Sequence, residues 1–278
     1  MTKRTKGWLI AAISLMLIGS ILFVGVMSKM NWKLNKGGYT TNTHAVTEAF
    51  TNLSVDVKNA DITFAPSTDG TVSVVCYEDV NIQHTVSVEG DALAIQEVDN
   101  RKWYQHLHIF SQSTKITVYL PEGSYGTLTI KASTGNVTIP KGFSFASADM
   151  DITTGDITCC AAVSGDMALH ITTGDVQLSD VTCRNLTATG TTGDITLNNV
   201  MASESFSIKC TTGEVSFDAC DAASLSVKTT TGDITGTLLT SKVFDAHATT
   251  GRVKVPQTTE GGSCKLRATT GSIKISLK

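Results

Sequence analysis

Five acidic residues recur at near-constant spacing in the second half of the chain, and they are the first candidates for chemistry. Each follows a repeated glycine by one position: Asp156, Asp175, Asp194, Glu214 and Asp233. If the repeats stack, these carboxylates lie about 5 Å apart, where like charges repel one another. A divalent cation such as Ca²⁺, which prefers oxygen ligands, would relieve that repulsion.

The alternative is that each Asp accepts hydrogen bonds from the backbone of a nearby turn. Calcium-binding β-helices use Gly-Gly-x-Gly-x-Asp nonapeptides, which this sequence lacks. We therefore favour the backbone role and predict neither a metal site nor a cofactor.

A second candidate is the stretch 97–110, which combines charged residues with large aromatic ones. Its centre holds Arg101, Lys102, Trp103 and Tyr104. Aromatic and basic side chains are enriched in binding surfaces, and the two rings could stack on a sugar. The alternative is a hairpin whose aromatic side chains pack on the end of the domain.

A third candidate is a mostly basic row four residues before each repeated glycine. Its members are Lys131, Asp151, His170, Thr189, Lys209, Lys228, His247 and Arg267. We expect this row to form an exposed stripe that could meet anionic cell-wall polymer or lipid headgroups. An ordinary solvated face is the alternative.

Catalytic motifs are absent from the sequence. The seven cysteines show neither Cys-x-x-Cys nor a zinc-site spacing. There is no Ser-His-Asp order with supporting motifs, Gly-rich phosphate loop or His-Glu-x-x-His. We therefore predict no catalytic residues and no enzyme activity. A net charge of −3 without a long basic run also argues against nucleic acid as a partner.

The elements that position these residues are built from one sequence motif, Thr-Thr-Gly-Asp-Ile, which recurs eight times with variations. Steps of 19 or 20 residues between its glycines are typical of one supersecondary unit stacked on copies of itself. Val or Ile follows each glycine by two positions, and apolar residues precede it by five and seven. The repeated glycines are Gly135, Gly155, Gly174, Gly193, Gly213, Gly232, Gly251 and Gly271.

This alternation predicts a half-buried strand on each side of the glycine. The buried positions are odd before the glycine and even after it, so the chain must turn a corner there. Glycine suits a corner because it adopts positive φ without a Cβ clash. The sequence therefore predicts an all-β fold, a parallel β-solenoid of 19–20-residue coils. Its last strand, within residues 271–278, is expected at an open edge.

The N-terminal segment predicts a membrane anchor. Residues 1–7 are basic, and residues 8–27 carry no charge and are long enough to span a bilayer as a helix. Because basic residues favour the cytoplasmic side, we expect residues 1–7 in the cytoplasm. The alternative is a cleaved signal peptide. We predict a single-pass protein of the cell membrane.

The remaining chain divides into a linker, residues 28–44, and one extracytoplasmic domain, residues 45–278. Its first part, 45–127, is irregular, and its second part, 128–278, holds the regular repeats. Within the first part, residues 53–64 look like a degenerate repeat with its corner at Asn59-Ala60. A hairpin is expected around Glu89-Gly90-Asp91.

Several of these stretches together resemble the DUF4097 family of bacterial envelope proteins, whose members are often described as adhesins. They are Gly-Asp-Ala-Leu-Ala-Ile at 90–95, the basic-aromatic residues 101–104, the strand 116–122 and the Thr-Gly-Asp-Ile repeats. The resemblance covers roughly residues 45–278. It implies a β-solenoid outside the membrane and no catalytic residues.

The function we predict is a non-catalytic binding or scaffold module, similar to an adhesin and held at the cytoplasmic membrane by residues 8–27. Cell-wall polymer or envelope proteins are its expected partners. An accessory or regulatory role in an envelope-stress response is the alternative. A polysaccharide-active β-helix enzyme is less favoured, because repeats of 19–20 residues leave little room for the loops that carry such sites.

Overall fold

A computed structural model describes residues 3–29, 38–101 and 114–278. The chain forms two compact units, Met1–Gly38 and Tyr39–Lys278. The first unit contains the helix α1 (Lys3–Lys29), and the large apolar side chains described along it, such as Leu15 and Ile21, are exposed. The transmembrane helix predicted at residues 8–27 is not confirmed: over the described residues, no helix combines the length and apolarity that a membrane crossing needs.

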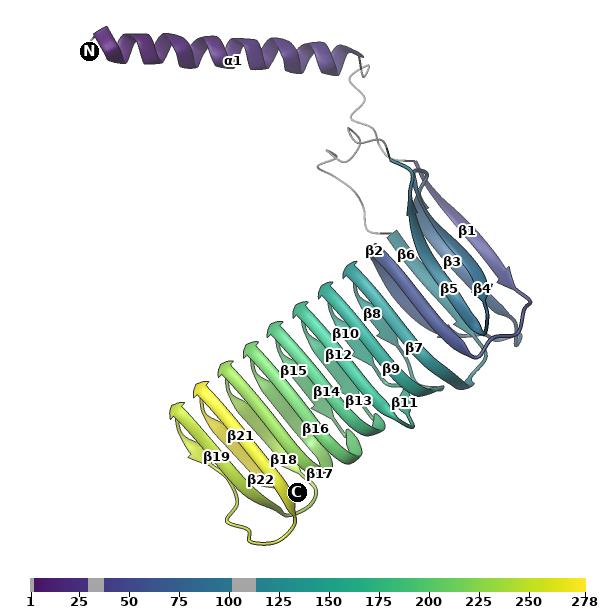
Figure 1. Cartoon of the computed structure of the whole chain (residues 1–278), viewed down its shortest axis with the longest axis vertical. Coiled ribbons are helices and arrows are strands. Elements are labelled where there is room, and N and C mark those ends of the chain that lie inside the picture. The colour runs from purple at the N-terminus through teal and green to yellow at the C-terminus, as the bar shows by residue number, and fades with distance from the viewer. Residues whose placement is uncertain (1–2, 30–37, 102–113) are drawn as a thin grey trace. The chain divides into compact units, whose positions relative to one another are not determined.

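The second unit is a two-sheet β-solenoid, which confirms the predicted all-β fold (Figure 1). Two long strands, β2 (Asn52–Pro66) and β17 (Val215–Thr231), pass through both sheets. Sheet A also contains β1 (Tyr39–Val46), β3 (Val72–Asp79), β6 (Thr114–Leu120), β8 (Val137–Ile139), β10 (Ile157–Cys159), β13 (Val176–Ser179), β15 (Ile195–Asn198), β18 (Ile234–Leu238), β20 (Val253–Lys254) and β22 (Ile273–Leu277). Sheet B also contains β4 (Ile82–Glu89), β5 (Ala92–Asp99), β7 (Gly123–Thr134), β9 (Phe143–Thr154), β11 (Ala162–Val163), β12 (Asp166–Thr173), β14 (Thr182–Thr192), β16 (Met201–Thr212), β19 (Lys242–Thr250) and β21 (Gly262–Thr270).

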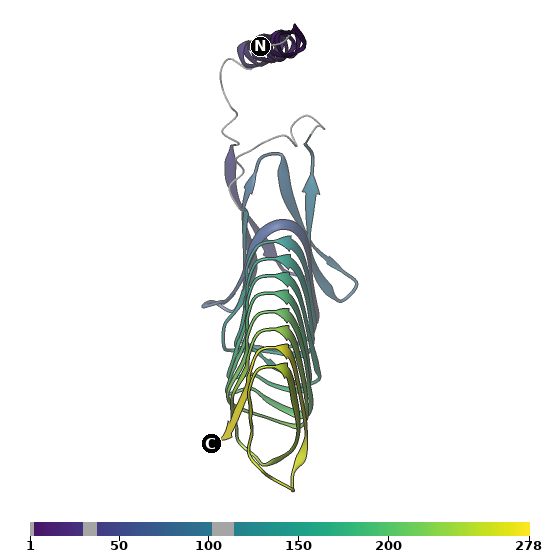
Figure 2. The same ribbon diagram turned by 90° about the vertical axis from the view of Figure 1, so that its left-hand side faces the viewer.

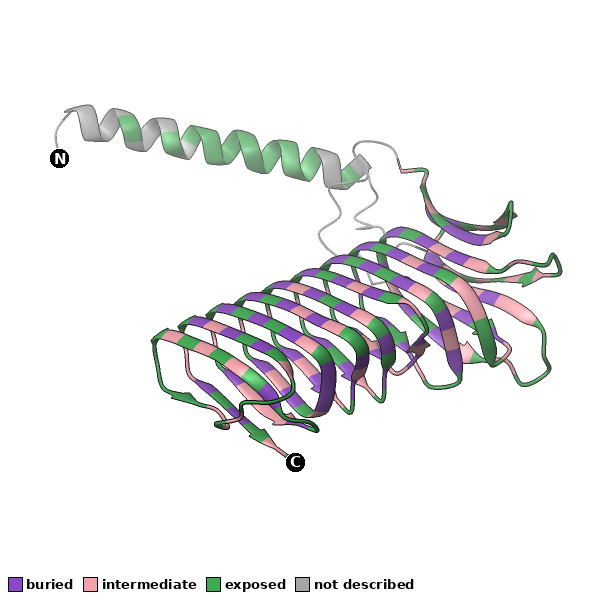
Figure 3. Cartoon of the chain, turned by 60° about the horizontal axis from the view of Figure 1, so that its bottom comes forward, coloured by how far each residue is buried: buried purple, intermediate pink, exposed green. Residues whose placement is uncertain are grey.

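Each regular coil runs along sheet B, turns at Thr-Thr-Gly and returns through sheet A. Neighbouring coils pair in parallel and in register, so that Leu169 lies between Met150 and Ala188. Figure 2 shows the coils nested behind one another. Buried and exposed residues alternate along the strands (Figure 3). The buried positions are odd before each repeated glycine and even after it.

The core lies between the two sheets. Leu186 in sheet B and Ile195 and Leu197 in sheet A are at most 1% exposed. Burying one such side chain contributes about 1.5–3 kcal/mol. Because every coil adds several of them, stacking supplies the burial that a single coil lacks.

The corner is a place of close backbone approach. All eight repeated glycines have φ between 129° and 147°, a range that L side chains rarely adopt. The Gly193 amide donates to the Thr212 carbonyl of the next coil at 3.0 Å. A Cβ added at Gly193 would overlap the carbonyl oxygen of Gly174, and the other repeated glycines are similarly placed. Only glycine therefore fits this position.

The N-terminal end departs from the regular coil. Strand β2 is a degenerate coil with Ala60 at the glycine position, directly over Gly135. Antiparallel pairs β1–β3, β3–β6 and β4–β5 then cover this end, and β4 and β5 form the hairpin expected around Gly90. The second unit begins at Tyr39, inside the stretch expected to be a linker.

The last two coils do not stack in chain order, which corrects the expectation that residues 271–278 form the open edge. Strand β21 pairs with β17 on one side and with β19 on the other, and β22 likewise lies between β18 and β20. The open edge is therefore formed by β19 and β20.

Two glycines make this insertion possible. A Cβ at Gly262 would overlap the Ala223 carbonyl, and one at Gly261 would overlap the Ser241 carbonyl. The inserted coil, which holds β21 and β22, thus fits closely between the coil of β17 and β18 and the coil of β19 and β20. The nearly buried ion pair between Lys242 Nζ and Asp221 Oδ1 also joins the edge coil to the coil beyond the inserted one.

Replacing Gly193 with Ala should lower the free energy of unfolding by about 3 kcal/mol, because it adds backbone strain and a clash with the neighbouring coil. Gly190→Ala is the matched control: the added Cβ would meet only side-chain atoms, the nearest being Ile195 Cδ1 at 3.6 Å. It should change stability by no more than about 1 kcal/mol. Denaturant unfolding followed by circular dichroism measures both, and equal effects would contradict the corner argument.

Candidate functional site

The acidic row lies along the corner and forms a ladder of hydrogen bonds. Asp156 Oδ1 accepts from the Asp175 amide at 2.9 Å, and Asp175 Oδ1 accepts from the Asp194 amide at 2.8 Å. Asn136 at the start of the row does the same for Asp156 at 2.8 Å. Asp61 of the degenerate coil extends the ladder to Asn136. An amide oxygen therefore replaces a carboxylate oxygen here without loss of the bond.

Glu214 departs from this pattern because its side chain is one methylene longer. The Glu214 amide donates to Asp194 Oδ1 at 2.7 Å, but Glu214 Oε1 accepts from the Thr235 hydroxyl at 2.6 Å. The Asn and Asp members of the row thus accept hydrogen bonds from backbone amides of the neighbouring coil, as Asp233 Oδ1 also does from the Ser272 amide. This geometry supports the structural role that we favoured over a Ca²⁺ site.

The aromatic candidate is described only at its border. Lys102, Trp103 and Tyr104 lie outside the described residues. Arg101 forms a two-point contact with Asp99, from Nε at 2.9 Å and Nη2 at 2.7 Å. This hydrogen bond raises the pKa of the Arg101 guanidinium.

The basic row runs across the outer face of sheet B. In stacking order its members are Lys131, Asp151, His170, Thr189, Lys209, Lys228, Arg267 and His247. The lysines and histidines are exposed. Among the described residues, Arg267 is the one member in an ion pair, with Asp245 at 2.5 Å. We call this set the basic stripe.

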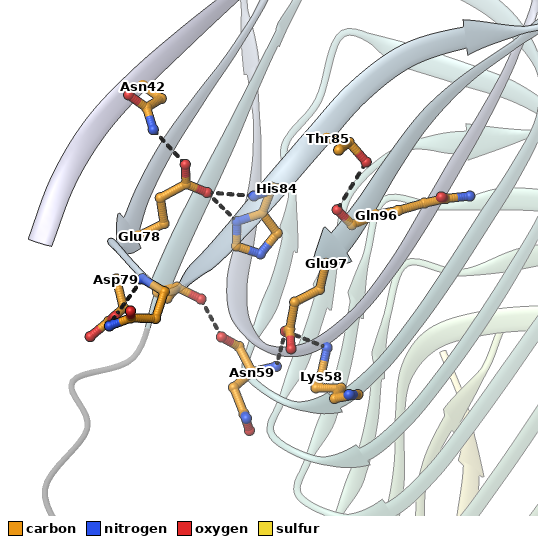
Figure 4. A network of polar contacts seen from close by, with 11 residues as sticks. Asn42, Lys58, Asn59, Glu78, Asp79, His84, Thr85, Gln96 and Glu97 are labelled. Atoms are coloured by element: carbon orange, nitrogen blue, oxygen red, sulfur yellow. Dashed lines mark hydrogen bonds and ion pairs between the residues drawn. The ribbon is translucent and has the colours of Figure 1, made fainter. Parts of the chain in front are cut away.

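A buried polar cluster, which the sequence did not predict, lies at the N-terminal end between the sheets. Glu78 Oε2 and His84 Nδ1 are 2.6 Å apart, and the His84 amide donates to the same oxygen at 2.7 Å. Asn42 Nδ2 donates to Glu78 Oε1 at 2.6 Å. Figure 4 shows Glu78 held between Asn42 and His84. We call Cys76, Glu78 and His84 the cap cluster.

The cap cluster is almost completely shielded from water. Its three members are 0%, 1% and 3% exposed, in chain order. Burial and the nearby Glu78 carboxylate raise the pKa of the Cys76 thiol to about 12. His84 Nε2 is buried without a hydrogen-bond partner. Burying a polar atom that has no partner is costly, so this nitrogen calls for an explanation.

Two strands bring the cluster together. Cys76 and Glu78 are two residues apart on β3, so both face inward from sheet A. His84 faces inward from β4 in sheet B, after a turn in which Asp79 Oδ1 accepts from the Asn81 amide at 2.8 Å. The signal in the sequence was the buried parity: Glu78 follows Val74 and Cys76 in strict alternation.

The acidic ladder predicts unequal effects of two substitutions at Asp175. Asp175→Ala removes the acceptor for the Asp194 amide and should lower the free energy of unfolding by about 1 kcal/mol. Asp175→Asn keeps an acceptor, as Asn136 does, and should stay within about 0.5 kcal/mol of the parent chain. Thermal and denaturant unfolding compare them. Equal destabilisation by both variants would show that the charge, not the hydrogen bond, matters.

The chain is similar to several known proteins. The profile of the family described as Toastrack DUF4097 matches residues 50–205 and 164–278. No curated protein matches the chain. A crystal structure of a "putative lipid binding protein" from Parabacteroides distasonis ATCC 8503 is 15% identical, with a TM-score of 0.50, and the match covers 85% of this chain and 97% of that one.

A "putative adhesin" from Bacteroides fragilis NCTC 9343 is 17% identical, with a TM-score of 0.47, over 87% of this chain and 98% of that one. A "putative adhesin" from Parabacteroides distasonis ATCC 8503 is 12% identical, with a TM-score of 0.47, over 86% and 98%. At sequence identities this low, the similarity to these structures is a similarity of fold alone. The family match, which spans most of the chain, shows that this protein belongs to the Toastrack DUF4097 family.

Proposed function

We propose that this protein is a non-catalytic binding module outside the bacterial membrane, and that its basic stripe binds an anionic polymer of the cell envelope. The observation that carries the proposal is the run of basic side chains on adjacent strands. Lys209 lies directly beside Lys228, and Lys228 lies beside Arg267.

The spacing of the stripe suits a polymer. Parallel strands lie about 4.8 Å apart, so the stripe repeats a positive charge at a fixed short interval. Like charges this close repel one another, and a bound polyanion relieves that repulsion. Lys265 is exposed on the same strand as Arg267 and adds to the positive charge there.

The absence of catalytic motifs and the family membership support a binding role over an enzymatic one. The similar fold from Parabacteroides distasonis is described as a putative lipid binding protein, which makes anionic lipid a second ligand to examine for this chain. An accessory role in an envelope-stress response remains compatible with binding, because such a module could present its ligand to a partner protein.

Attachment to the cytoplasmic membrane through residues 8–27 is part of the proposal. Its support is the uncharged sequence from Trp8 to Met27, with basic residues before it. Apolar side chains such as Leu17 and Leu22 are also exposed on α1. Exposed apolar surface of this kind is stabilised by lipid.

The basic stripe predicts a face-specific loss of binding. Lys209→Glu with Lys228→Glu should weaken binding of the full-length chain to a polyglycerol-phosphate polymer at least tenfold, because two adjacent charges are reversed. Lys254→Glu with Lys274→Glu is the matched control, since these lysines are also neighbours but lie in sheet A. Binding is measured by co-sedimentation at two salt concentrations.

Equal losses in the two double variants would contradict a role for the stripe and indicate only attraction by total charge. Vesicles with and without phosphatidylglycerol form a second arm of the experiment. Binding to the anionic vesicles alone would replace the polymer by a lipid surface as the ligand of this face.

Membrane attachment is tested by fractionation of cells that express the full-length chain. We expect the protein in the membrane fraction and resistant to extraction by high salt. Replacing Leu17 and Leu22 with Arg should shift most of it to the soluble fraction, because each charge within an apolar span costs about 2.5–3.5 kcal/mol. A parent chain that high salt releases would overturn this part of the proposal.

A further inference from the structure

We propose that the cap cluster, Cys76, Glu78 and His84, is a binding site for Zn²⁺ at the N-terminal end of the solenoid. One ligand atom from each residue lies within 4.8 Å of the others. Within residues 3–29, 38–101 and 114–278, this is the one group of three or more His, Cys, Asp or Glu side chains that converges in this way. The acidic row and the exposed histidines do not.

The set of donor atoms indicates the metal. A thiolate, an imidazole and a carboxylate are the ligands that Zn²⁺ takes in proteins, with a fourth position open to water or another group. Ca²⁺ and Mg²⁺ prefer oxygen ligands and would find one carboxylate here. Sulfur and nitrogen donors together therefore favour Zn²⁺.

The geometry of the His84 ring decides which of its nitrogens could bind the ion. One ring nitrogen of His84 faces Glu78, and the other, Nε2, is buried without a hydrogen-bond partner. Because Nε2 lies on the far side of the ring from Nδ1, the nitrogen that can bind the same ion as Glu78 is Nδ1.

A hydrogen bond from outside the cap cluster also holds one of the ligands in place. Asn42 Nδ2 donates to Glu78 Oε1 and fixes the carboxylate from strand β1 (Figure 4). Such outer contacts orient the ligands of a metal and raise its affinity. Strand β1 pairs with β3 along its whole length, with Asn42 directly opposite Cys76.

A bound ion would stabilise the N-terminal end of the solenoid. Cys76 and Glu78 come from sheet A and His84 from sheet B, so one ion would join the two sheets where regular coils end. Formation of the Zn–S bond replaces the S–H bond of Cys76, and the proton leaves to solvent. Because the cluster is buried, we expect the ion to enter as the cap folds.

The test uses the full-length chain in mild detergent, unfolded with a chelator and refolded with ZnCl₂, with CoCl₂ or without metal. We expect about one Zn²⁺ per chain by elemental analysis and a higher Tm with Zn²⁺ than without it. The Co²⁺ form should show thiolate-to-cobalt charge-transfer absorption, which requires a cysteine ligand.

Cys76→Ala and His84→Gln should each lower metal affinity at least tenfold. Cys159→Ala, which removes a thiol buried in the regular coils, and His170→Gln, which changes an exposed histidine, are the matched controls and should leave affinity unchanged. Far-UV circular dichroism checks that each variant folds.

Several results would overturn the site. They are less than about 0.1 metal per refolded parent chain, bound Co²⁺ without thiolate absorption, or equal losses in Cys76→Ala and Cys159→Ala. If Cys76→Ala fails to fold, the cobalt spectra of the parent chain and of Cys159→Ala still decide. Failure of this test leaves the basic stripe untouched, because Lys209 and Lys228 belong to other coils.

Discussion

The structure depends on the close approach of one backbone to the next at the Thr-Thr-Gly corner. Each repeated glycine lies over a carbonyl of the neighbouring coil with no space for a Cβ, and its amide donates to another carbonyl of the stack. This contact sets the register of both sheets at once. It therefore places the apolar rows in the core and the acidic and basic rows in lines on the surface.

The acidic row shows how the same constraint accounts for a line of carboxylates. Carboxylates in a line about 5 Å apart resemble a cation site when only their spacing is known. In the structure, each aspartate reaches the next coil's backbone amide, and Asn136 serves equally well. The need of the corner for hydrogen-bond acceptors accounts for these residues.

The sequence predicted the features that recur in every coil, and few of the features that occur only once. Periodicity was enough for parallel pairing between coils, the inward rows and the corner at Asn59-Ala60, because each depends on contacts between equivalent positions. The order of the last two coils was not predictable, since coils with the same pattern fit one another in either order. The deciding features were single residues outside the pattern, Gly261, Gly262 and the Lys242–Asp221 pair.

The cap cluster was missed for a related reason. A cap has no copies, so its polar residues form no row that spacing could reveal. The one indication in the sequence was that two polar residues, Glu78 and His84, occupy positions that the alternation of the strands assigns to the core. A buried carboxylate is stable only with partners, and Asn42 and His84 supply them from strands on both sides. The end of a solenoid must close an apolar core against water, and here a polar group that ties sheet A to sheet B lies at that boundary.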